Sequence, residues 1–101
     1  MSNTATEHRQ AAEDRINELS ALLQQQPKGE VRDRLLDECA ALARAIAAFH
    51  MEGIRFRMFN VDRTLAKGAL PLPAEAASIF ADARRHLEAA GFQTRSHQAP
   101  G

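Results

Sequence analysis

Apolar residues recur at steps of three and four in three parts of the chain. Within residues 4–26, Thr4 and Glu7 have the spacing of a capping box at a helix start, and Pro27 with Gly29 ends the pattern. The apolar positions of this part share one face of a helix: Ala12, Ile16, Leu19 and Leu23. The pattern predicts a first helix of roughly 20 residues.

A second apolar pattern extends from Glu30 to Lys67. Its members are Val31, Leu35, Leu42, Ile46, Ile54, Met58, Val61 and Leu65. Residues 54–58 also alternate as a strand does, but no second strand-like run exists with which they would pair. Gly53 costs a helix interior about 1 kcal/mol without ending the helix. We therefore expect one helix on the order of 55 Å long, ended by Gly68, with a break near Gly53 as the alternative.

A third helix is predicted between Pro73 and Gly91. Its apolar face is formed by Ala76, Phe80, Ala83, Leu87 and Ala90. Gly91 suits the left-handed position after a helix, and Phe92 is placed to fold back onto the last turn. We expect an all-α fold of three helices (short, long, short) in an antiparallel bundle. Residues 4–92 would form a single domain, between a disordered N-terminus (1–3) and a mobile tail (93–101).

The expected long helix has an uncovered apolar flank, because each of its halves has only one neighbouring helix. Contiguous exposed apolar patches are rare on monomers, and a two-fold dimer covers such a patch with a second copy of itself. We therefore expect a coiled-coil-like homodimer. Its predicted interface consists of Phe49, His50, Ile54, Phe56, Met58, Phe59, Leu70 and Leu72.

The charge of the chain is balanced overall but divided between its halves. Thirteen basic and thirteen acidic residues give a formal net charge of zero. Residues 1–53 carry nine acids and six bases, and residues 54–101 carry four acids and seven bases. Zero net charge argues against a general polyanion binder, whereas opposite halves suit a head-to-tail dimer. A nucleic-acid surface remains the alternative, with contacts from Arg55, Arg57, Arg63, Lys67, Arg84 and Arg85.

Little in the sequence indicates catalysis or a bound cofactor. The single cysteine, Cys39, excludes a disulfide framework and a thiolate zinc cluster. Asp82 and His86 are four residues apart, as in an ordinary surface pair. No phosphate loop, nucleophile elbow or Glu-x-x-His pair occurs. We expect no catalytic residue, metal or cofactor, although a ligand or metal pocket around Phe56, Phe59 and His50 is a third hypothesis.

The expected location is the cytosol. No stretch approaches the roughly 20 apolar residues that span a bilayer, and residues 1–10 lack the apolar region of a signal peptide. The leading hypothesis is a small protein–protein interaction module (an adaptor, an assembly factor or a complex subunit) that acts as a homodimer with an unknown protein partner. The alternative is a nucleic-acid-associated regulator.

Overall fold

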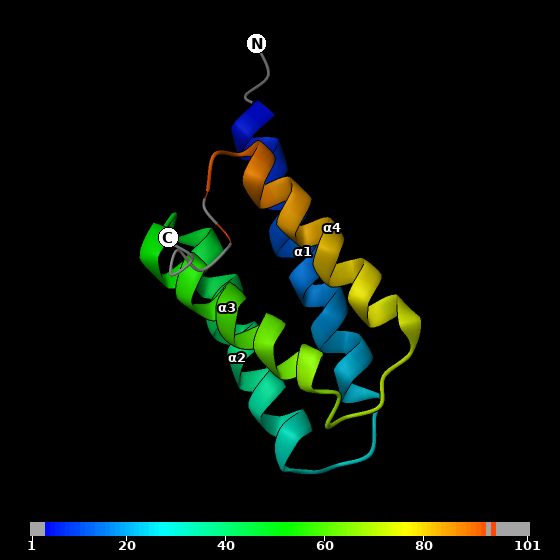
Figure 1. Cartoon of the computed structure of the whole chain (residues 1–101). Coiled ribbons are helices and arrows are strands. Elements are labelled where there is room, and N and C mark those ends of the chain that lie inside the picture. The colour runs from blue at the N-terminus through cyan, green and yellow to red at the C-terminus, as the bar shows by residue number, and fades with distance from the viewer. Residues whose placement is uncertain (1–3, 93, 95–101) are drawn as a thin grey trace.

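The computed structural model describes residues 4–92 and 94, and all its regular elements are helices (Figure 1). They are α1 (Thr4–Gln24), α2 (Glu30–Ala47), α3 (Met51–Lys67) and α4 (Ala74–Ala89). The predicted all-α class is confirmed, whereas the predicted count of three helices is wrong. The terminus predicted to be disordered (1–3) lies outside the described residues, as does the predicted tail (93–101) apart from Thr94.

The long helix is divided because α2 ends in a Schellman motif. Phe49 has φ 59°, in the left-handed region. Its N–H donates to the carbonyl of Ile46 at 3.2 Å, and the N–H of His50 donates to the carbonyl of Ala45 at 2.9 Å. These two bonds define the motif, which usually places glycine at the left-handed position. The predicted continuous helix from Glu30 to Lys67 is therefore wrong.

The Phe49 ring is held by residues from two other parts of the chain. Its centre lies 6.4 Å from that of the Phe92 ring, edge to face. The Arg9 guanidinium lies 5.0 Å from the same centre. Edge-to-face aromatic pairs and cation–π contacts are each favourable, so these contacts offset part of the cost of a left-handed phenylalanine.

The helix does break near Gly53, as the alternative prediction has it, but the break lies at Phe49 and His50 and Gly53 itself lies inside α3. His50 is the N-cap of α3, and its Nδ1 accepts a hydrogen bond from the Gly53 N–H at 3.1 Å. A Cβ at position 53 would lie 2.4 Å from that Nδ1 and 3.3 Å from the Cβ of Ala45. Glycine is thus favoured here by the close approach of the His50 side chain and not by backbone conformation.

Because α3 folds back along α2, the four helices enclose one core. α1 packs against α2 and α4, and α2 packs against α3 (Figure 1). The molecule measures 44 × 33 × 22 Å. The predicted apolar faces meet in the interior, where the largest fully buried side chains include Ile16, Leu19, Leu23, Leu35, Leu42, Ile46, Ile54, Met58, Val61 and Leu87.

Glycines end α3 and follow α4 as the sequence predicts. Gly68 is left-handed, with φ 68°, at the end of α3. After α4, Gly91 has φ 98° and its N–H donates to the carbonyl of Glu88 at 3.0 Å. The Phe92 N–H donates to the carbonyl of Leu87 at 2.9 Å. This is a second Schellman motif, here with glycine at the left-handed position.

Arg84 connects α3, α4 and the segment that follows α4. Only 8% of this residue is exposed. Its guanidinium donates to the carbonyl oxygen of Thr94 at 3.0 Å and to its Oγ1 at 3.1 Å, and lies 3.5 Å from the Asp62 carboxylate of α3. Thr94 Oγ1 in turn donates to the Glu88 carboxylate at 2.8 Å. Thr94 is therefore buried and tethered beside α3 and α4.

Candidate functional site

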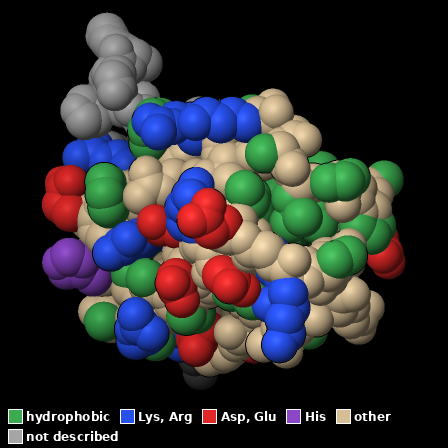
Figure 2. Space-filling model, turned by 90° about the horizontal axis from the view of Figure 1, so that it is seen from below, with side chains coloured by type: hydrophobic (Ala, Val, Ile, Leu, Met, Phe, Trp, Pro, Cys, Tyr) green, Lys and Arg blue, Asp and Glu red, His purple; other side chains and the backbone are tan. Residues whose placement is uncertain are grey.

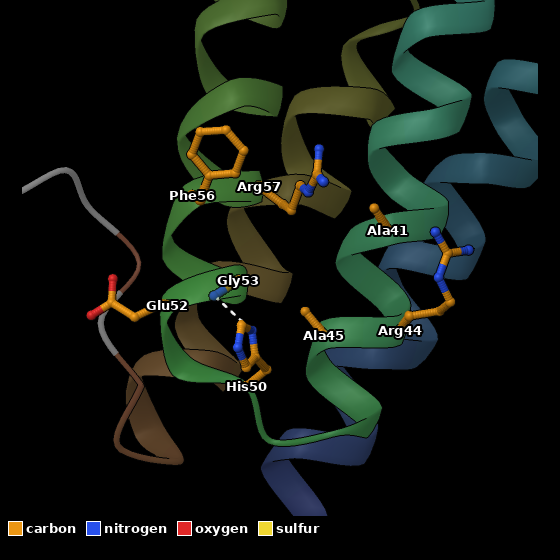
Figure 3. Close-up of a pocket in the computed structure, with 8 residues that line it drawn as sticks. All are labelled: Ala41, Arg44, Ala45, His50, Glu52, Gly53, Phe56 and Arg57. Atoms are coloured by element: carbon orange, nitrogen blue, oxygen red, sulfur yellow. Dashed lines mark hydrogen bonds between the residues drawn. The ribbon is translucent and has the colours of Figure 1, made fainter.

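A groove with a volume of about 460 Å³ lies between the end of α2 and the start of α3 (Figure 3). Its small residues are Ala41 and Ala45 on α2 and Gly53 on α3, and the two alanines project from α2 toward α3. The other lining residues are larger and mostly polar: Arg44, His50, Glu52, Phe56 and Arg57. The His50–Gly53 hydrogen bond fixes one end of the groove.

Phe56 is the prominent apolar residue of this groove. It is 57% exposed, although α3 also has a buried face on which it would be sheltered. The Arg57 guanidinium lies 5.1 Å from the centre of its ring and donates to the Glu38 carboxylate of α2 at 3.1 Å. Arg57 is therefore held in place between the two helices, and the Phe56 ring is left open to solvent.

Charged residues of opposite sign are arranged along the outer side of α2 and α3. On α2, Asp37 lies in the first half of the helix and Arg44 in the last turn. The order along α3 is the same, with Glu52 in the first turn and Arg63 and Lys67 toward the end. Because the two helices are antiparallel, the acidic end of α2 lies beside the basic end of α3. All five residues are exposed.

The residues predicted to form a dimer interface do not form one surface. Ile54 and Met58 are fully buried within the chain, so the exposed flank from which the dimer was inferred is covered by the other helices. His50 and Phe56 share the groove, and Phe49 is exposed at the α2–α3 turn. The remaining members are half-buried, Phe59 on α3 and two leucines in the α3–α4 loop: Leu70 and Leu72.

The predicted nucleic-acid contacts are also separated. Arg84 is buried in its bonds to Thr94, Arg57 is paired with Glu38, and Arg55 donates to Glu52 at 2.8 and 3.0 Å. The other three are exposed on two different helices, Arg63 and Lys67 on α3 and Arg85 on α4. The six residues therefore do not present a continuous basic stripe of the kind that follows a phosphate backbone.

The end of the molecule that carries the α3–α4 loop has an apolar surface. In Figure 2, which looks at this end, green side chains gather on one side. Two hollows of about 350 and 280 Å³ share Leu70 and Pro71. The first is completed by residues 27–32 before and within α2, and the second by Leu72, Pro73 and the start of α4.

The described residues contain no reactive thiol and no cluster of three or more metal-binding side chains. Cys39 is fully buried, and this burial raises the pKa of its thiol to about 12, an effect that a hydrogen bond from Ser20 opposes. Residues 4–92 and 94 contain no group of three or more His, Cys, Asp or Glu side chains placed to hold a metal ion. Among the same residues, no helix has both the length and the hydropathy of a membrane span.

The sequence did not predict the close contact between His8 and His86. The Nδ1 atoms of His8 on α1 and His86 on α4 lie 2.8 Å apart. The pairing of residues 78 positions apart depends on α1 and α4 being neighbours. Sequence periodicity showed only that Asp82 and His86 share a helix face.

Comparison of the chain with protein-family models, with curated proteins and with solved structures finds no match.

Proposed function

We propose that this protein is a small helical interaction module that forms a homodimer through the α2–α3 face, meaning the outer side of these two helices around the groove. The observation that carries the proposal is the exposure of Phe56, at 57%, beside a groove with small side chains on its α2 side. A large exposed aromatic residue beside a hollow is typical of an interface anchor.

A dimer with its two-fold axis parallel to the helices accounts for both the exposed Phe56 ring and the groove beside it. It places α2 of one copy against α3 of the other at the same height along the helices. Phe56 and the alanines line one groove and therefore lie at similar heights. Each Phe56 ring then meets Ala41 and Ala45 of the second copy, and this contact is made twice. Full burial of a phenylalanine side chain contributes about 1.5–3 kcal/mol.

The charges along the α2–α3 face support the same arrangement. With α2 opposite α3 of the second copy, Asp37 faces the basic end that carries Arg63 and Lys67. At the other end, Arg44 faces Glu52. These pairings are between opposite signs, which favours one orientation of the two copies and disfavours others. Arg34, which is also exposed in the first half of α2, is a like charge beside the basic end of α3 and offsets part of this preference.

Sedimentation velocity over a range of protein concentrations tests this proposal. We expect a monomer–dimer equilibrium for the unchanged protein, and an association constant lowered at least about tenfold by Phe56→Ser, the equivalent of about 1.4 kcal/mol. Met51→Ser is the matched control, because Met51 is 41% exposed on the same helix but lies about 140° around the helix from Phe56. A protein that stays monomeric at high micromolar concentration would contradict the proposal, as would an equal effect of the two substitutions.

A further inference from the structure

The contact between His8 and His86 is independent of the α2–α3 face, because it joins α1 to α4. The two Nδ1 atoms are 2.8 Å apart, and the ring centres are 5.1 Å apart with the planes tilted by 36°. The rings therefore point nearly head-on at each other. Both residues are only partly buried, with 28% of the His86 side chain exposed.

A carboxylate lies near the nitrogen of His86 that does not face His8. Asp82, one turn earlier on α4, places its Oδ2 3.7 Å from Nε2 of His86. The same carboxylate accepts a hydrogen bond from Arg85 at 2.6 Å, and Arg15 of α1 lies 3.9 Å from it. The carboxylate is too far away for a hydrogen bond, but its negative charge favours the tautomer with the proton on Nε2. In that tautomer the Nδ1 of His86 is an acceptor directed at the Nδ1 of His8.

A neutral imidazole whose second nitrogen faces a carboxylate is the usual form of a metal-binding histidine. With metal–nitrogen bonds of about 2.0–2.1 Å, a tetrahedral ion holds two ligand nitrogens roughly 3.3 Å apart. The His8 and His86 nitrogens would need to separate by roughly half an ångström from the observed 2.8 Å. Rotation of two partly exposed side chains allows this movement, and His8 would carry its own proton on Nε2.

We propose that His8 and His86 bind one divalent transition ion, of the class to which Zn²⁺, Ni²⁺ and Cu²⁺ belong, across the start of α1 and the end of α4. Imidazole nitrogens suit these ions. The described residues provide two protein ligands, so water completes the coordination. Asp82 acts as a positioning residue that orients His86 and does not touch the ion.

Such an ion would link the N-terminal end of α1 to the C-terminal end of α4. Because it binds the folded chain and the two ligands are far apart in the sequence, it stabilises the fold by mass action. Each ligand nitrogen must be unprotonated, so affinity for the ion falls as the pH is lowered.

Titration with Zn²⁺, followed by calorimetry and by thermal unfolding, tests the site. We expect saturable binding and a rise in melting temperature for the unchanged chain. His8→Gln and His86→Gln should each abolish both effects, whereas Asp82→Asn should weaken binding about tenfold. His97→Gln is the control for adventitious binding by another histidine and should behave like the unchanged chain. Circular dichroism verifies that each variant folds.

Electron paramagnetic resonance with Cu²⁺ provides a second readout that does not depend on stability. The unchanged chain should show coupling to two imidazole nitrogens, and His8→Gln to one at most. The inference is overturned if the unchanged chain shows no saturable binding of Zn²⁺, or if either His8→Gln or His86→Gln retains the unchanged affinity.

Discussion

The side chain of His50 accepts a hydrogen bond from the backbone N–H of Gly53 at 3.1 Å, and this contact begins α3 immediately after α2 has ended. The imidazole takes the role of the serine, threonine or aspartate that usually caps a helix. It has room to do so because position 53 lacks a Cβ. One apolar stripe is thereby divided into two antiparallel helices.

Gly53→Ala should therefore destabilise the fold mainly through His50. The added Cβ would lie 2.4 Å from Nδ1, so the imidazole must move and the cap is lost, at a cost of about 1 kcal/mol. In a His50→Ala background this cap is already absent, and the same change should cost about 1 kcal/mol less. Urea unfolding of the two single variants and the double variant measures this coupling. Strictly additive effects would show that Gly53 and His50 are not coupled.

Arg84 and Arg85 are adjacent in sequence but should differ in their contribution to stability. Arg84 is buried and hydrogen-bonded to Thr94, so Arg84→Met leaves buried acceptors without a donor and should lower the free energy of unfolding by about 2 kcal/mol. Arg85 is exposed and paired with Asp82, and Arg85→Met should change it by less than about 0.5 kcal/mol. Chemical denaturation of the two variants measures this difference. Equal effects would show that the hydrogen bonds from Arg84 to Thr94 do not stabilise the fold.

Burial of Cys39 should make the stability of the fold depend on pH in the alkaline range. Burial raises the pKa of its thiol from 9.0 to about 12, so the folded chain holds this proton more tightly than the unfolded chain does. Its contribution to stability is complete below about pH 9 and is lost as the pH rises toward 12. The free energy of unfolding, measured across this pH range, should fall more steeply for the unchanged chain than for Cys39→Ala. Equal slopes for the two chains would contradict this prediction.

The same burial should protect the thiol from reagents. Disulfide exchange needs the thiolate, and Cys39 is both fully buried and protonated at neutral pH. We expect reaction with an aromatic disulfide reagent to be slow in the folded chain and fast in denaturant. Rapid reaction of the folded protein would show that the α1–α2 contact around Cys39 opens readily.

Hydrophobic periodicity was sufficient to predict which residues form the core, but not where the long stripe turns back. Ile46 and Ile54 are eight residues apart, a spacing that keeps two residues on one broad face of a helix, so the apolar pattern gives no sign of the turn between them. The usual signal of a left-handed residue was also missing, because position 49 is phenylalanine and not glycine or asparagine. At Gly68 and Gly91 that signal was present, and the helix ends were predicted correctly.

The candidate site was only partly accessible to sequence reasoning for a related reason. His50 and Phe56 were predicted as interface residues and do share the groove. Ala41 and Ala45 line it only because α3 folds back along α2, a contact between residues that a continuous helix would keep apart. The His8–His86 pair depends in the same way on the packing of α1 against α4.

The central claim is that two copies associate through α2 and α3, and exchange of charges tests it most directly. Asp37→Arg and Arg63→Glu should each weaken self-association, because like charges then meet across the two-fold axis. Mixing the two variants should restore a dimer, since position 37 of each chain then carries a charge opposite to that at position 63 of the other. Light scattering that shows a heterodimer of native size would support the claim; a mixture that stays monomeric, or single variants that still form dimers as well as the unchanged chain, would contradict it.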